Sequence, residues 1–187
     1  YKDYPGGHLY RYHPEASNKN VKLPDMQAEV EDLGIPVSHN SIYAMTSSPD
    51  GSEIYGITYP DGHFFVYNIA MDQFNNVGNI DQKIVFHGPE RYWRSLCRDL
   101  ICDNNGNVYF SGTHGELNYY SPKTRSFHST GQKIPGDYYP DQFFEDYAVV
   151  DYFDRDDQTG LIYGGSSDGY LFVFDPVKNE LRNLGKP

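Results

Sequence analysis

The sequence repeats itself with a period of about 54 residues, and this period constrains the fold more than any other feature. Four related segments stand at this spacing, and they are GGHLYRYHP (6–14), DGHFFVYNI (61–69), HGELNYYSP (114–122) and DGYLFVFDP (168–176). Their aligned glycines, which are Gly7, Gly62, Gly115 and Gly169, lie 55, 53 and 54 residues apart. A fixed period of this length indicates a repeat architecture in which each unit packs on its neighbours.

Each repeat predicts short β-strands and no helix. The four segments are followed by VEDLGIP (30–36), FNNVGNI (74–80), SFHSTGQ (126–132) and LRNLGKP (181–187). In the last three repeats, two further strand-like segments come first, joined by SPDGS, DNNGN or RDDQTG, which is Asn/Asp/Gly hairpin chemistry. Tyr, Phe, Val and Ile dominate these segments, as half-buried strands require. Pro24 argues against a helix through residues 15–29.

Four strands per unit, repeated in order, predict an all-β fold of the β-propeller type with four-stranded antiparallel blades. A β-sandwich also has short strands, but it does not repeat the same four segments. We expect an outer half-blade in residues 1–36 and complete blades in 41–80, 93–131 and 146–187. Propellers usually close with about four to eight blades. We therefore expect the chain to be one piece of a longer assembly, with the remaining blades supplied by a longer or partner chain, and not to close into a ring by itself.

Composition excludes several other classes. The chain has 187 residues and a formal net charge of −11, which makes it a poor binder of nucleic acid or anionic membranes. Its 16% aromatic content argues against disorder, and no apolar run is long enough for a membrane helix. The sequence begins at Tyr1 without Met or a signal peptide, so we expect a processed chain or a fragment.

The repeats resemble known proteins. The run WRSLCRDLICDNNGNVYFSGTHGELNYYSPKTRSF (93–127) is similar to the propeller repeat of bacterial periplasmic sensor proteins. YGITYPDGHFFVYNI and YGGSSDGYLFVFDPVKNELRNLGKP resemble repeats of secreted bacterial propellers, some of them related to polysaccharide lyases. The shared residues are turn glycines and strand aromatics, which identify architecture and transfer no chemistry. The resemblance implies a secreted or periplasmic location.

Five of the seven histidines fall in segments that the blade topology places on one side of the propeller. The loop between the second and third strands and the linker between blades must emerge on the same side. We expect this side to carry the ligand, because binding residues of all-β scaffolds gather in such loops. The histidines in these segments are His8, His39, His63, His87 and His114.

YPGGH (4–8) and YPDGH (59–63) stand at equivalent positions in two repeats. Repetition favours a structural role, in which Pro and Gly set a turn and Tyr packs between blades. The alternatives are that Tyr59, His8 and His63 contact a ligand, or that both imidazoles join a metal site completed by His87 or His114. No short spacing such as HxxxH occurs, so we predict neither a metal nor another cofactor.

A second candidate cluster is HGPERYWRS (87–95), which leads into a predicted innermost strand. Arg94 could pair with a carboxylate and Trp93 could stack on a sugar ring. Tyr92 and His63 could transfer protons, so an enzyme would use Tyr92, Arg94 and His63 as catalytic residues. The alternative is that Trp93 and Tyr92 wedge adjacent blades. Residues expected to contact a ligand are His8, Tyr59, His63, His87, Trp93, Arg94, His114 and Tyr147.

Other polar residues carry weaker signals. Asp154, Asp156 and Asp157 are closely spaced, but the EF-hand pattern is absent and a solvated hairpin turn on the opposite side is expected. Arg155 in the same turn is expected to be an exposed charge that contributes little. Cys97 and Cys102 fall on one predicted strand, about 16 Å apart, so we expect two free thiols.

Three functions remain open at this point. The first is a carbohydrate-recognising propeller whose partner is a glycan or oligosaccharide bound on the loop side. The second is a polysaccharide lyase acting on uronate-containing glycans, with Arg94 neutralising the sugar carboxylate. The third is a protein-interaction scaffold. Nucleic-acid binding and membrane insertion are not expected.

Overall fold

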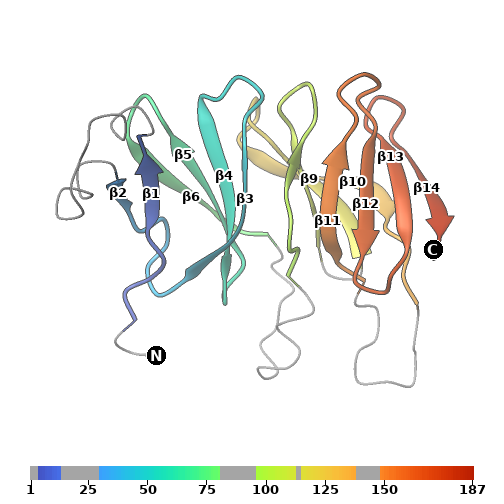
Figure 1. Ribbon diagram of the computed structural model, residues 1–187, viewed down its shortest axis with the longest axis horizontal. Helices are drawn as coiled ribbons and strands as arrows, with labels where there is room; N and C mark the ends of the chain where they lie inside the picture. The colour runs from blue at the N-terminus through green and yellow to red at the C-terminus, as the bar shows by residue number, and fades with distance from the viewer. Residues whose placement is uncertain (1–3, 14–29, 81–95, 113–114, 138–147) are drawn as a thin grey trace, which may run out of the picture.

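The computed structural model describes residues 4–13, 30–80, 96–112, 115–137 and 148–187, and all of its regular elements are β-strands. They form one two-stranded and three four-stranded antiparallel sheets, which follow one another along the chain (Figure 1). The chain therefore contains three complete blades and half of another, as the repeat predicts.

The two-stranded sheet consists of β1 (Leu9–Tyr12) and β2 (Val30–Gly34). The next sheet contains β3 (Ser41–Ser47), β4 (Glu53–Tyr59), β5 (His63–Asn68) and β6 (Gln73–Asn79). The third contains β7 (Ile101–Cys102), β8 (Val108–Ser111), β9 (Glu116–Ser121) and β10 (Ser126–Lys133). The last contains β11 (Val150–Arg155), β12 (Ile162–Ser166), β13 (Leu171–Asp175) and β14 (Glu180–Gly185).

Neighbouring strands pair in chain order within every four-stranded sheet. β7 lies beside both β3 and β11, so the first strands of three sheets meet along one line. This is the arrangement of propeller blades around an axis, with the first strand innermost. The fourth strands lie at the rim and consist of exposed and half-buried residues only.

The core lies between successive sheets and consists largely of aromatic rings. Between the second and third sheets, the ring of Phe64 lies 5.0 Å from Tyr120 and 6.0 Å from Phe110. Between the third and fourth sheets, Tyr109 lies 5.3 Å from Phe174. These separations are typical of packed aromatic pairs. Many of the Tyr and Phe side chains therefore pack between neighbouring blades.

One predicted strand is much shorter in the structure. Residues 94–102 were expected to form the innermost strand of the third blade, but within the described part of this segment only Ile101–Cys102 is a strand. Asp99 explains the difference, because its carboxylate accepts hydrogen bonds from the backbone N–H of Leu100 and, at 2.7 Å, of Phe153 in β11. The Asp99 side chain, rather than a backbone carbonyl, thus accepts the hydrogen bond from the N–H of Phe153.

Each sheet has two ends with different connections. The hairpin turns after the first and third strands lie at the upper end in Figure 1, which we call the hairpin face. The loops between the second and third strands and the linkers between sheets lie at the opposite end, which we call the loop face. The first and last sheets stand at opposite sides of the view, so the row of blades is open.

Candidate functional site

His8, His39 and His63 lie on the loop face, at or just before the starts of β1, β3 and β5. Ser41 pairs with Tyr59 and His63 pairs with Asn79, so the ends of all four strands of the second blade meet there. His39 precedes β3, and its backbone N–H donates to the carbonyl of Pro5, just before His8. His87 and His114, which the sequence analysis assigns to the same side, lie outside the described residues.

The contacts of His8 and His63 indicate a structural role at the rim. Nδ1 of His8 lies 2.9 Å from both carboxylate oxygens of Asp32, and Nδ1 of His63 lies 3.2 Å from Oδ1 of Asn76. Asp32 and Asn76 occupy equivalent positions in β2 and β6, the outermost strands. The two imidazoles therefore lie against the rim strands and away from the axis.

Asp32 and Asn76 belong to a closing motif of the outermost strands. In each of the four sheets, a polar side chain accepts a hydrogen bond from the N–H of a glycine two residues later. The pairs are Asp32–Gly34, Asn76–Gly78, Ser129–Gly131 and Asn183–Gly185, at 2.8 to 3.1 Å. The hydrogen bond with His8, followed by the bond from the N–H of Gly34, lowers the pKa of Asp32 below its ordinary value.

A buried amide holds the loop between β4 and β5. Asn40 is 2% exposed, and its Oδ1 accepts hydrogen bonds from the hydroxyl of Thr58 and the N–H of Asp61. Its Nδ2 donates to the carbonyl of Ser38 and to the carboxylate of Asp61. This single side chain fixes the linker before β3 to the loop that carries Tyr59 and His63.

Three tyrosines gather beside this loop, and we call them the tyrosine cluster: Tyr4, Tyr43 and Tyr59. The hydroxyl of Tyr4 lies 3.2 Å from Oγ of Ser41, and the ring of Tyr43 lies 6.0 Å from that of Tyr59. The pairing of β3 with β4 is irregular at Tyr43, between Ile42 and Ala44. The ring of Tyr4 is exposed, and the other two are half-buried. Rings with hydroxyl groups at one edge can pack on a ligand and hydrogen-bond to it.

His39 adds a polar group beside the cluster. Its Nδ1 lies 2.9 Å from the carbonyl oxygen of Tyr4, which can only accept, so Nδ1 carries the proton. The backbone of His39 has a positive φ of 62°, a conformation that is uncommon outside glycine. His39 is exposed, and its position ties the segment before β1 to the linker before β3.

The whole of the second cluster that the sequence indicates, residues 87–95, lies outside the described residues. Tyr92, Trp93 and Arg94 lie outside the described residues, and so does Tyr147. Of the expected ligand residues, the structure thus brings Tyr59 into the tyrosine cluster and places His8 and His63 at the rim. Sequence reasoning missed the contact of Tyr4 with Ser41 and the contact of Tyr43 with Tyr59, because both depend on which strand ends meet in space.

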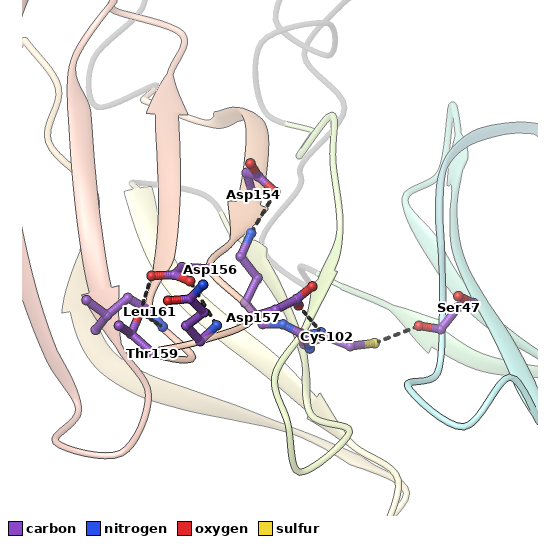
Figure 2. A network of polar contacts seen from close by, with 9 residues as sticks. Ser47, Cys102, Asp154, Asp156, Asp157, Thr159 and Leu161 are labelled. Carbon is purple, nitrogen blue, oxygen red and sulfur yellow. Dashed lines mark hydrogen bonds and ion pairs between the residues drawn. The ribbon is translucent and has the colours of Figure 1, made fainter.

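The hairpin face carries a groove that the sequence analysis did not anticipate. It has a volume of about 340 Å³ and lies where the first strands of three blades meet. Its lining includes Thr46, Ser47, Ile101, Cys102, Asp154, Arg155 and Asp157. Figure 2 shows the polar contacts around it, which run from the turn after β11 to Cys102 and Ser47.

Arg155 is a link between blades, and the expectation that it is a free exposed charge is wrong. Its side chain is 21% exposed, and Nη1 donates at 2.7 Å to the backbone carbonyl of Cys102 in β7. Nη2 lies 3.0 Å from the carboxylate of Asp157, whose side chain is largely exposed. Asp156 accepts hydrogen bonds from Thr159 and the N–H of Gln158, so its carboxylate closes the turn (Figure 2).

The two cysteines are free and buried, as expected, but they do not share a strand. Cys102 belongs to β7, whereas Cys97 lies in the irregular segment before it and accepts a hydrogen bond from the N–H of Ser111. Burial raises the pKa of Cys97, and burial followed by the charge of Asp103 raises that of Cys102 to about 12. Neither thiol is activated as a nucleophile.

Within the part of the chain that the structure describes, no group of three or more His, Cys, Asp or Glu side chains could hold a metal ion. The same residues contain no helix with the length and apolar character needed to cross a membrane.

Comparison with known proteins identifies the architecture. No protein-family model matches the chain, and no curated protein matches its sequence. Among solved structures, it is similar to a candidate 6-phosphogluconolactonase from Bacteroides uniformis, with a TM-score of 0.59 and 15% identity over 97% of this chain and 48% of that one. The Dos1 propeller is similar with a TM-score of 0.54 and 13% identity over 79% and 34% of the two chains. The fold is a β-propeller.

A further neighbour is the extracellular domain of a candidate one-component system from B. thetaiotaomicron, with a TM-score of 0.53 and 14% identity over 78% of this chain and 17% of that one. The chain spans between 17% and 48% of the lengths of these three neighbours. Because all three identities are low, the likeness concerns the propeller fold alone. Specific chemistry must be argued from the residues of this chain.

Proposed function

We propose that this chain is part of a carbohydrate-recognising propeller and that the ligand binds on the loop face at the tyrosine cluster. The observation that carries the proposal is that the Tyr4 hydroxyl lies against Ser41, while Tyr59, the strand partner of Ser41, packs on the ring of Tyr43. The exposed imidazole of His39 lies beside Tyr4. Sugar rings offer an apolar face of C–H groups and a rim of hydroxyls. Tyrosine rings and hydroxyls complement both parts.

The class of sugar follows from the charges near the cluster. The tyrosine cluster and the adjacent Ser41 contain no Lys or Arg, so this surface suits a neutral oligosaccharide. The chain as a whole has a net charge of −11, which repels an acidic glycan unless a cation lies beside the ligand. An acidic sugar would therefore depend on Arg94, which the sequence places at the start of the predicted innermost strand of the third blade.

The resemblance of the repeats to secreted and periplasmic bacterial propellers supports an extracytoplasmic location as part of the same proposal. The names of the structural neighbours cover different activities, and none is carried over to this chain. The lyase alternative needs His63 to act together with Tyr92 and Arg94. The described geometry gives it no support, because the imidazole of His63 lies against Asn76 in the rim strand.

The test is oligosaccharide binding by isothermal titration calorimetry with three variants of Tyr4 and Met71. Tyr4→Ala removes an exposed ring and should weaken binding of a neutral oligosaccharide by roughly tenfold, which is about 1.4 kcal/mol. Tyr4→Phe keeps the ring and should bind within about threefold of the wild type. Met71→Ala, which changes an exposed residue in a turn of the hairpin face, is the control and should bind as the wild type does.

Two results would overturn the proposal. One is the absence of binding across a panel of neutral and uronate-containing oligosaccharides, which would leave the scaffold alternative. The other is wild-type affinity in Tyr4→Ala, which would remove the tyrosine cluster as the site. Appearance of new unsaturated uronate absorbance during the titrations would instead favour the lyase.

A further inference from the structure

A second hollow on the hairpin face lies between the second and third sheets, and we call it the interblade hollow. It has a volume of about 300 Å³, at the lower end of the range of ligand pockets in proteins. The turns β3–β4, β7–β8 and β9–β10 form its walls. Its lining includes Pro49, Asp50, Glu53, Asn104, Asn105 and Pro122.

Two carboxylates in the interblade hollow accept hydrogen bonds only from uncharged groups of the described residues. Oδ1 of Asp50 accepts from the hydroxyl of Ser48 at 2.6 Å and from the N–H and hydroxyl of Ser52 at 3.0 and 2.8 Å. These bonds, first that of Ser48, lower the pKa of Asp50 to about 2, so its carboxylate stays ionised. Oε2 of Glu53 accepts at 2.8 Å from the hydroxyl of Tyr55. No described Lys or Arg lines this hollow, so it is a negatively charged hollow.

The wall formed by the β7–β8 turn carries amide groups. Asp103 fixes this turn, since its Oδ1 accepts a hydrogen bond from the N–H of Asn105 at 2.8 Å. Asn104 and Asn105 are exposed, and neither side-chain amide makes a hydrogen bond with another described residue. Each amide offers both a donor and an acceptor. A peptide backbone supplies the matching carbonyl and N–H groups, whereas a free polyamine supplies no carbonyl.

The groove at Arg155 adjoins the interblade hollow, because Ser48 and Pro49 line both. This groove contains the carboxylates of Asp154 and Asp157, and the guanidinium of Arg155 already pairs with Asp157. The two adjoining hollows therefore both carry unneutralised negative charge. Such a surface suits a chain with cationic side chains at intervals better than it suits a single small cation.

We propose that the interblade hollow binds an extended segment of a partner protein that carries lysine or arginine side chains. One cationic side chain enters beside Asp50 and Glu53, with its alkyl stem against the rings of Pro49 and Pro122. The backbone of the segment bonds to the amides of the β7–β8 turn, and a further cation reaches the groove at Arg155. The net charge of −11 favours the approach of such a segment. The hollow lies on the hairpin face and the tyrosine cluster on the loop face, so this inference is independent of the proposed function.

The test is the fluorescence anisotropy of a labelled hexalysine peptide titrated with the chain at low salt. Glu53→Gln and Asp50→Asn each keep a hydrogen-bond acceptor and remove one charge, and each should weaken hexalysine binding roughly fivefold. Glu180→Gln removes the same charge from an exposed residue of the rim strand β14. It is the matched control and should bind hexalysine within about 1.5-fold of the wild type.

Spermidine distinguishes a peptide site from a site for free polyamines. Asn105→Ala should weaken hexalysine binding about threefold and leave spermidine binding unchanged, because spermidine has no carbonyl to accept from the amide. Circular dichroism checks that each variant folds. Three results would overturn the proposal: no hexalysine binding by the wild type, equal losses in Glu53→Gln, Asp50→Asn and Glu180→Gln, or displacement of hexalysine by spermidine at an equal concentration.

Discussion

Arg155 shows how one side chain can connect blades at the axis of this fold. Its guanidinium reaches from β11 to the carbonyl of Cys102 in β7, while the thiol of Cys102 donates at 3.2 Å to the carbonyl of Ser47 in β3. Two polar contacts therefore join three innermost strands. Interactions of this kind cannot be read from the sequence, because the RDDQTG turn predicts only a solvated hairpin and gives no partner for the arginine.

We expect Arg155→Ala to lower the free energy of unfolding by about 1.5–2 kcal/mol, because a charged hydrogen bond to a backbone carbonyl is lost and that carbonyl is left without its donor. Urea denaturation measures this change. Lys178→Ala is the control, since Lys178 pairs with Asp175 at the surface and its removal should leave the unfolding midpoint unchanged. Equal midpoints for the two variants would show that Arg155 is not a structural link.

At the scale of the strands, the repeated Leu-Gly and Val-Gly pairs have a physical reason. Gly34, Gly78 and Gly185 have φ values of 96°, 125° and 91°, and each N–H is bound by the polar side chain two residues earlier. The strand pairing shifts register at these points. The outermost strand of each blade is thus ended by the same local structure, which the sequence displays as a repeat.

Gly78 offers a test of this motif, because a Cβ atom there would meet nothing within 4 Å. Any cost of Gly78→Ala is therefore conformational, and we expect a loss of at least about 1 kcal/mol in the free energy of unfolding. Gly51 is the matched control, since it is also in open space but has a φ of 69°, which an alanine tolerates better. A larger loss in Gly51→Ala than in Gly78→Ala would contradict this explanation.

The strands could be predicted because their pattern is local, whereas the site could be predicted only in part. Alternating aromatic residues and hairpin turns identify β3 to β6 without knowledge of their neighbours. The short β7 was missed because Asp99 bonds to the N–H of Phe153 in another blade. The tyrosine cluster was missed because Tyr4 and Ser41 are 37 residues apart in the sequence and meet only when the segment before β1 lies against the linker before β3.

At the scale of the whole molecule, equivalent repeats pack in the same direction, each third strand covering the second strand of the blade before it. This regular packing places the loop-face residues of successive blades on one side. Tyr55 and Tyr109 stand at one repeat position and are both buried against the following blade, at 1% and 4% exposure.

The packing of successive blades is the central claim, and a two-dimensional NOESY spectrum of the aromatic protons tests it most directly. The Tyr109 and Phe174 rings, 5.3 Å apart, and the Phe64 and Tyr120 rings, 5.0 Å apart, belong to different blades and should give cross-peaks. Tyr109 and Tyr119, 5.4 Å apart within one sheet, provide the internal reference. A reference cross-peak without the two cross-peaks between blades would contradict the account.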